Sequence, residues 1–181
     1  SNDILDDLRL VSGLWIEVTL TSETTVLQTL RDLYGVAGDT VREMLEQDVA
    51  IPTVSLHETE EDEATLAQQA SVIKLVNELL TDAMRQRASD LHIEPDEQEL
   101  IVRVRVDGIL RRQAVPPQLH RFRLAICSRL KILASLNIAE KRLPQDGGFR
   151  TTVSGREIDV RVSIIPMLHG EGVVLRLLES N

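Results

Sequence analysis

The stretch LHIEPDEQELIVRVRVDGILRRQAV, residues 91–115, contains the pattern that decides the fold. Between Leu100 and Val106 apolar residues alternate with arginine, which predicts a strand with one buried face. Asp107-Gly108 follows it and is a typical two-residue hairpin turn, after which Ile109 to Val115 continues as a second strand. LHIEP (91–95) is a third, shorter strand candidate. The stretch therefore predicts the first half of an antiparallel sheet.

The segments on either side of this stretch extend the same pattern. A wide apolar stripe predicts a helix before it, and two prolines open a second helix after it. Beyond a turn-rich loop at residues 141–148, three more strands are expected, two of them joined by a turn at Ser154-Gly155. The order helix, three strands, helix, three strands predicts an α+β domain with helices packed on a mainly antiparallel sheet. The expected helices and strands of this second group are Leu66–Arg87, Gln118–Leu136, Phe149–Val153, Glu157–Ile165 and Val173–Leu178.

Residues 1–50 differ from this pattern. Leu14 to Leu20 reads as a strand, a helix capped by Ser22 should end at Gly35, and a second short helix is expected over Thr40 to Gln47. These elements are too few to bury a core alone, so we expect them to be the tail of a larger domain. Residues 51–64 are acidic and aperiodic and read as a linker.

Composition excludes several classes of protein. Hydrophobic residues make up 43% and charged residues 27%, as in an ordinary globular chain. Aromatic residues are only 2% and the net charge is −9, which argues against single-strand and phosphate-backbone nucleic-acid binding. There is no signal peptide and no apolar run approaching 18 residues, so we expect a soluble, cytoplasmic protein.

Several polar residues invite a catalytic or metal-binding interpretation. His92 and Glu94 should share one face of a strand, but the sequence nominates no third metal ligand. Ser89 and Asp90 lack a nucleophile elbow, so capping or turn hydrogen bonds are the favoured role. Cys127 is the only cysteine and lies in an apolar helical run, which favours a buried thiol and excludes an internal disulfide.

Two arginines, Arg161 and Arg176, stand in strands of alternating apolar residues (DVRVS and VVLRLLE). Each could simply face solvent, which is common for arginine in a half-buried strand. Each could also present its planar, permanently charged fork to a phosphate or carboxylate. The chain has no G-x-x-x-x-G-K-[ST] or G-x-G-x-x-G motif, so it has no evident site for holding a triphosphate by itself.

Five segments, in this order, resemble the N2 domain of type II secretion ATPases (GspE) and of their type IV pilus assembly relatives (PilB). They are ASDLHIEP (88–95), VRVRVDGIL (102–110), SRLKILASLNIAEKRLPQDG (128–147), GREIDVRVSIIP (155–166) and HGEGVVLRLLE (169–179). LRDLYGVAGDTVREMLEQ (30–47) is similar to the end of the preceding N1 domain. The resemblance implies the end of an α/β N1 domain over 1–50, an acidic linker over 51–67 and a PAS-like N2 domain over 68–181. It also implies that the catalytic ATPase domain lies outside this chain.

The resemblance further implies a function. The chain would be a non-catalytic part of a hexameric secretion motor, which couples ATP hydrolysis in the missing domain to an inner-membrane platform protein (GspL-like). Arg161 and Arg176 would contact the γ-phosphate of ATP bound by a neighbouring subunit, with ATP and Mg²⁺ held by the full-length parent and no metal or cofactor by this chain. Such a chain would be cytoplasmic and peripheral to the bacterial inner membrane through its partners.

Two departures and two alternatives accompany this reading. Gly148 and Gly172 stand where the family usually has basic residues. The parent could serve pilus assembly instead of type II secretion. A free-standing PAS-like sensor or adaptor domain is a hypothesis of a different class, and a Walker A motif downstream of Asn181 would argue against it.

Overall fold

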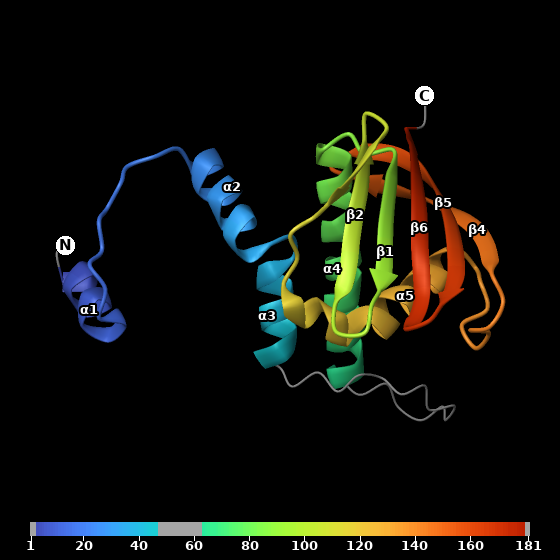
Figure 1. Cartoon of the computed structure of the whole chain (residues 1–181), viewed down its shortest axis with the longest axis horizontal. Coiled ribbons are helices and arrows are strands. Elements are labelled where there is room, and N and C mark those ends of the chain that lie inside the picture. The colour runs from blue at the N-terminus through green and yellow to red at the C-terminus, as the bar shows by residue number, and fades with distance from the viewer. Residues whose placement is uncertain (1–2, 47–62, 180–181) are drawn as a thin grey trace. The chain divides into compact units, whose positions relative to one another are not determined.

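A computed structural model describes residues 3–46 and 63–179 of the chain (Figure 1). Its helices are α1 (Asp3–Ser12), α2 (Glu23–Tyr34), α3 (Gly38–Glu46), α4 (Glu63–Arg85), the 3₁₀ helix η1 (Pro117–Phe122) and α5 (Arg123–Leu133). Its strands are β1 (Asp90–Pro95), β2 (Leu100–Val106), β3 (Ile109–Arg112), β4 (Gln145–Val153), β5 (Arg156–Met167) and β6 (Gly170–Glu179). By compactness the chain divides into residues 1–30 and residues 31–181. None of the described helices is both long and apolar enough to cross a membrane.

The second unit contains one six-stranded antiparallel sheet, with strand order β3-β2-β1-β6-β5-β4. The predicted α+β class and the predicted order of elements are both confirmed. Each half of the sheet is a run of three strands joined by tight turns. Both residues of the Asp107-Gly108 turn have positive φ (51° and 79°), and so do Ser154 and Gly155 (51° and 78°). Positive φ at both central residues is what a type I′ hairpin requires, and it agrees with the right-handed twist of the strands.

Helices α4 and α5 cover one face of the sheet (Figure 1). The alternation seen in the sequence determines which face they cover, because every second side chain of a strand points the same way. In β6, for example, Val173, Leu175 and Leu177 are buried while Arg176 is exposed. The predicted stripe of α4 packs against this apolar face, with Leu75, Leu80 and their apolar neighbours on the same stripe buried. The opposite face of the sheet carries the polar residues.

Several predicted boundaries in this unit are wrong, and three of them bear on the sheet and the helix that follows β3. The helix expected over Gln118–Leu136 begins as the 3₁₀ turn η1 and becomes α-helical only at Arg123. Strand β3 ends at Arg112, short of Val115. Strand β4 starts at Gln145, inside the predicted loop, because Gln145 to Gly148 pair with β5. Glycine and aspartate are unfavourable in strands, but this preference is weak compared with a complete ladder of backbone hydrogen bonds. The loop prediction from composition is wrong for this reason.

The N-terminal predictions are partly wrong. Helix α2 begins after Ser22, whose Oγ accepts a hydrogen bond from the Thr25 N–H (3.2 Å), as expected for an N-cap. Residues 14–20, however, form no strand, and helix α1 was not predicted. Trp15 and Leu20 are 86% and 100% exposed, so no other element buries the apolar side chains of this run and burial does not stabilise a strand here. A strand also needs a neighbouring strand for its backbone groups, and among the described residues no strand pairs with this run.

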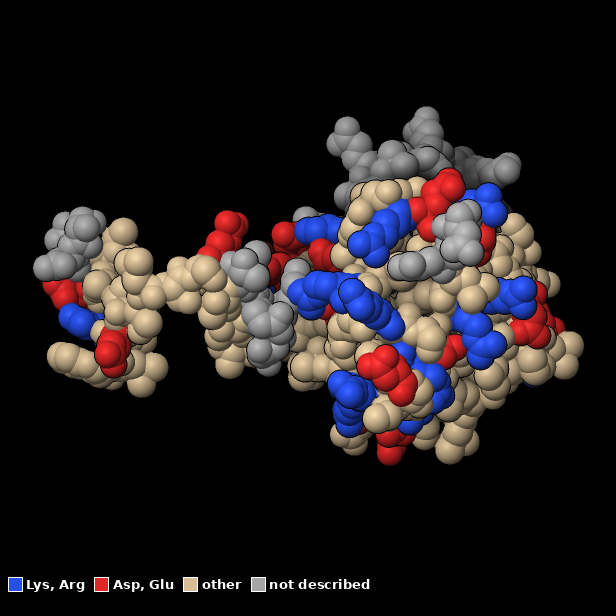
Figure 2. Space-filling view, turned by 90° about the horizontal axis from the view of Figure 1, so that it is seen from above, with Lys and Arg blue, Asp and Glu red and all other residues tan. Residues whose placement is uncertain are grey.

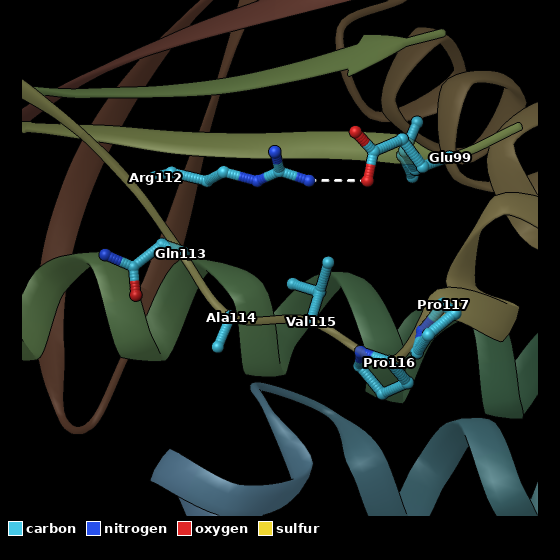
Figure 3. Close-up of a pocket in the computed structure, with 8 residues that line it drawn as sticks. Glu99, Arg112, Gln113, Ala114, Val115, Pro116 and Pro117 are labelled. Atoms are coloured by element: carbon cyan, nitrogen blue, oxygen red, sulfur yellow. Dashed lines mark hydrogen bonds and ion pairs between the residues drawn. The ribbon is translucent and has the colours of Figure 1, made fainter. Parts of the chain in front are cut away.

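Helix α3 is attached to the sheet unit through the segment between β3 and η1. The Val36 N–H donates to the Ala114 carbonyl (2.9 Å), and the Thr40 hydroxyl donates to Glu78 of α4 (2.8 Å). Figure 3 shows Ala114 in the segment that leaves β3, which also lines a shallow pocket of about 140 Å³. Gly35 lies against this segment with φ +79°, and a Cβ there would sit 2.7 Å from the Val115 Cα. The close approach therefore requires glycine.

Gly35→Ala is expected to lower the free energy of unfolding of the sheet unit by about 2–3 kcal/mol, from left-handed strain plus the backbone clash. Gly155→Ala is the matched control, because Gly155 has φ +78° and nothing within 4 Å of its Cβ position. It should lose only the conformational part, about 1 kcal/mol. Urea denaturation of both variants measures the difference, and equal losses would show that contact with Val115 does not matter.

Candidate functional site

A row of cross-strand partners with four charged side chains at its centre crosses the open face of the sheet. Residues directly opposite one another in adjacent strands point to the same face, so the register places these side chains next to each other. In the order of the strands from β3 to β4, the row consists of Leu110, Arg105, Asp90, Arg176, Arg161 and Gly148. The two arginines singled out in the sequence, Arg161 and Arg176, are direct cross-strand partners in this row. The fold therefore brings them together.

This juxtaposition carries an electrostatic cost. Directly opposite residues in antiparallel strands have Cβ atoms about 4.5–5.5 Å apart, and like charges at that distance destabilise the pair. Both arginines are exposed, Arg176 by 65% of its side chain, so water reduces the repulsion without removing it. An anion placed between the two guanidinium groups would relieve the repulsion and be bound by both.

Asp90 neutralises one side of this row. Its Oδ1 accepts from the Arg176 Nε (3.0 Å) and its Oδ2 accepts from the Ser89 hydroxyl (2.8 Å). The Arg105 Nε lies 3.3 Å from the same Oδ2. The carboxylate is 6% exposed, because the two arginines of the flanking strands cover it. The predicted local hydrogen bonding of Asp90 accounts for the Ser89 contact only: its other partners, Arg105 and Arg176, lie across the sheet.

The surroundings of Asp90 change its acidity. Burial disfavours the charged carboxylate and acts to raise its pKa. The hydrogen bonds from Ser89 and Arg176 and the charges of Arg176 and Arg105 outweigh burial, so the pKa of Asp90 lies below its usual value of 3.8. A pKa that is lower in the folded state than in the unfolded state means that the ionised group stabilises the fold above about pH 4. That contribution is lost as the pH falls through the folded-state pKa.

Arg176→Ala is expected to raise the pKa of Asp90, because it removes both a hydrogen bond and a positive charge while burial remains. The pH dependence of stability below about pH 4 should become shallower in this variant. Titration of the Asp90 side-chain carboxyl by NMR measures the pKa directly. Arg150→Ala, which removes the exposed partner of Asp159, serves as a control that should leave Asp90 unchanged. An unchanged pKa in Arg176→Ala would contradict the arrangement described above.

Arg161 has no such neutralising partner. Among the described residues, no hydrogen bond or ion pair of its side chain is found. Other arginines of the sheet are paired, such as Arg150 with Asp159 (2.8 Å) and Arg112 with Glu99 (2.5 Å), the latter drawn in Figure 3. Figure 2 shows the same tendency, with basic side chains (blue) interspersed with acidic ones (red) over this unit. Arg161 is therefore the exposed cation of the row that is left for an external anion.

Of the two glycines that the resemblance places where the family usually has basic residues, Gly148 belongs to this row and Gly172 lies four residues away along β6, opposite Ile165. Gly148 is the partner of Arg161 in β4, and a Cβ there would lie 2.9 Å from the Val160 carbonyl oxygen. A side chain at residue 148 would need a local backbone shift, so the space beside Arg161 stays open. At Gly172 a Cβ would lie 2.4 Å from the Met167 Sδ, a flexible side chain that occupies the position instead.

A second polar cluster lies one row further along β1. As predicted, His92 and Glu94 share a face, with the His92 Nδ1 3.4 Å from the Glu94 Oε1. Glu94 also forms an ion pair with Arg103 of β2. This carboxylate is therefore engaged on both oxygens. Within the described part of the chain, no three His, Cys, Asp or Glu side chains are grouped so that they could hold a metal ion.

A buried ion pair was not predicted from the sequence. Lys131 of α5 is 1% exposed, and its Nζ lies 2.6 Å from the Glu171 Oε1 and donates to the Glu140 carbonyl (2.6 Å). Cys127 lies beside it and is buried, as predicted; burial together with the Glu171 charge raises its pKa to about 12. A thiol with this pKa stays protonated and unreactive. Lys131 lies on the same helical stripe as buried apolar residues of α5, and this position could have predicted from the sequence that its charge is buried.

A sequence model of the family described as "Type II/IV secretion system protein" matches residues 65–181, more than half of the chain. The chain belongs to this family. The resemblance drawn from the five motifs is thereby confirmed. The match covers the whole sheet and α5, including Arg161 and Arg176.

Individual members of the family are similar to between 61% and 98% of the chain. The type IV pilus assembly ATPase PilB of Myxococcus xanthus is 41% identical over 98% of this chain and 31% of its own length. A type II secretion system protein E of Xanthomonas campestris is 42% identical over 97% of this chain and 30% of its own length. The type II secretion system protein HxcR of Pseudomonas aeruginosa is 56% identical over 61% of this chain and 23% of its own length. The chain thus spans less than a third of the length of these relatives.

Proposed function

We propose that this chain is a non-catalytic N-terminal region of a hexameric type II secretion motor ATPase. Arg161 and Arg176 would face the γ-phosphate of ATP held, with Mg²⁺, by the catalytic domain of a neighbouring subunit. The observation that carries the proposal is the direct cross-strand pairing of these two arginines on an open sheet face, where one of them lacks a counter-charge. Arginine forks suit phosphate oxygens, and such groups stabilise the charge that develops during phosphoryl transfer.

The rest of the chain would connect this site to the secretion machinery. In this proposal residues 68–181 form the PAS-like N2 domain, residues 1–50 are the end of an N1 domain that binds an inner-membrane platform protein, and 51–67 is the linker. Residues 47–62 lie outside the described residues. Residues 63–67, the last part of this linker, belong to helix α4, which begins at Glu63. The protein would be cytoplasmic and held at the membrane by its partners. The length of the related proteins supports a further domain, since this chain covers under a third of each.

Comparison of the isolated chain with the full-length gene product tests the proposal. The 181-residue chain should not turn over MgATP, whereas the full-length protein should. Measurable hydrolysis by the isolated chain that disappears on Arg161→Ala would contradict the proposal. The reading frame beyond Asn181 gives a cheaper test, because a Walker A motif within about 50–200 residues favours the motor. A stop codon or a signalling domain there would favour a PAS-like sensor or adaptor.

A pilus assembly motor is the second candidate. The 41% identity to PilB over 98% of the chain supports it about as well as the relatives named for type II secretion support the first. Deleting the gene and assaying twitching motility and protein secretion separates the two. Loss of secretion alone supports type II secretion, and loss of pili alone supports pilus assembly.

A further inference from the structure

The guanidinium group of Arg176 is held at one end only. Its Nε donates to the Asp90 Oδ1 at 3.0 Å, and in the part of the chain that the structure describes neither Nη1 nor Nη2 has a partner. A guanidinium has five N–H donors in a fixed plane, so fixing the Nε–H also fixes the direction of the other four. The side chain is 65% exposed, which leaves these terminal donors accessible.

Asp90 is itself fixed in place. It lies between β2 and β6, opposite Arg105 on one side and Arg176 on the other. Its second oxygen, Oδ2, accepts a hydrogen bond from the Ser89 hydroxyl and lies 3.3 Å from the Arg105 Nε. A carboxylate that is 6% exposed and bonded at both oxygens has little freedom to rotate. It is therefore a rigid anchor, whereas Arg176 alone would be a flexible surface side chain.

We propose that Asp90 is a positioning residue for Arg176: it holds the Nε–H and aims the two terminal nitrogens at the phosphate that the proposed function assigns to this site. This inference rests on that proposed function and adds a residue to it. Because the three arginines of the row, Arg105, Arg176 and Arg161, outnumber the one aspartate, the row keeps a net positive charge for an anionic ligand. Asp90 supplies direction without cancelling the attraction.

Two substitutions in the full-length protein test the proposal by steady-state hydrolysis of MgATP. Asp90→Ala should lower kcat about 10-fold, since an arginine misplaced by about 1 Å loses part of its effect. Asp90→Asn should recover part of that loss, because its amide oxygen can still accept from the Arg176 Nε. Adding Asp90→Ala to Arg176→Ala should cause no further loss, because Asp90 acts through Arg176. Glu99→Gln is the control. It weakens the ion pair of Glu99 with Arg112 of the edge strand β3, neither of which belongs to the row, and it should not change kcat.

Arg176→Lys covers the case in which the Asp90 variants fold poorly, because residue 176 is on the surface. Lysine keeps the charge but cannot be held at Nε while presenting two further nitrogens, so its kcat should fall within a few-fold of Arg176→Ala. A lysine variant with wild-type kcat would overturn the proposal. Hydrogen exchange of the Arg176 Nε–H, followed by NMR in the 181-residue chain, adds a readout without nucleotide. That proton should exchange faster in Asp90→Ala, and an unchanged rate would also overturn the proposal.

The outcomes separate the two proposals. If both Arg161→Ala and Arg176→Ala hydrolyse ATP like the wild type, the phosphate-facing role in the proposed function fails and the positioning role fails with it. If only Arg161→Ala is impaired, Arg176 does not act on the phosphate and the positioning role alone fails. If Arg176→Ala is impaired but Asp90→Ala is not, only the positioning role fails. If the losses of the two single variants multiply in the double variant, Asp90 acts independently of Arg176 and the positioning role is again overturned.

Discussion

Arg161→Ala and Arg176→Ala are each expected to lower kcat for ATP hydrolysis by the full-length protein about 100-fold or more. Arginines supplied to a phosphoryl-transfer site stabilise the charge on the transferred group, and their loss costs about 10³–10⁵ in known cases. The smaller estimate applies here because the two arginines are neighbours in the row and one can partly replace the other. The double variant should therefore lose more than either single variant.

Arg161→Ala should keep the wild-type stability, since its side chain is exposed and has no partner among the described residues. Arg176→Ala should lose the stability that its hydrogen bond and charge give through Asp90, so its hydrolysis is assayed under conditions where the variant is folded. Arg150→Ala is the matched control: Arg150 is an exposed arginine in the adjacent strand β4, paired with Asp159 rather than with the row. Its kcat should equal that of the wild type. Unchanged hydrolysis in both Arg161→Ala and Arg176→Ala would remove the phosphate-facing assignment. A loss equal to theirs in Arg150→Ala would show that the effect comes from the general charge of the face.

Lys131→Met is expected to lower the free energy of unfolding by about 3–5 kcal/mol, the largest stability effect that the structure suggests. Lys131 and Glu171 are 1% and 9% exposed, so removing the ammonium leaves a carboxylate with little access to water. The Glu140 carbonyl would also lose one of its two donors and keep only the Gln145 side-chain amide (3.2 Å). Urea denaturation of the 181-residue chain, followed by circular dichroism, measures the change.

Two further variants identify the cause. Lys131→Met combined with Glu171→Leu removes both charges, and it should recover most of the loss because a buried ion pair and a well-packed apolar pair are often similar in energy. Lys74→Met breaks the exposed pair of Lys74 with Glu43, where both side chains are about half exposed, and should cost at most about 1 kcal/mol. If the double variant is no more stable than Lys131→Met, the loss comes from packing rather than from an unpaired charge.

Local pattern was sufficient to predict the elements of the sheet unit. The alternation over Leu100–Val106, the Asp107-Gly108 turn and the stripe of α4 each concern neighbouring residues, and all three are confirmed. The predictions failed where a local preference is overridden by a distant partner. Gln145 to Gly148 read as a loop and pair as a strand, whereas residues 14–20 read as a strand and pair with no strand among the described residues.

The candidate site shows the same division. That Arg161 and Arg176 stand on strand faces follows from their alternating neighbours. That they oppose each other depends on the register of the β5–β6 hairpin. That Asp90 anchors one of them depends on pairing between strands far apart in the sequence, since Asp90 and Arg176 are separated by 86 positions. The Lys131–Glu171 pair likewise joins a helix to a strand that follows much later. Spacing within one segment contains no information on such pairs.

The position of β6 has a consequence for how the chain assembles. It is the last strand in sequence but lies at the centre of the sheet, between β1 and β5. Until residues 170–179 have left the ribosome, β1–β3 and β4–β5 are two separate ribbons with no strand joining them, and the two-stranded β4–β5 ribbon is marginal at best alone. Cooperative folding of the sheet unit must therefore wait for the end of its synthesis. The same closing step brings Arg176 between Asp90 and Arg161, so an incomplete domain cannot carry the assembled row.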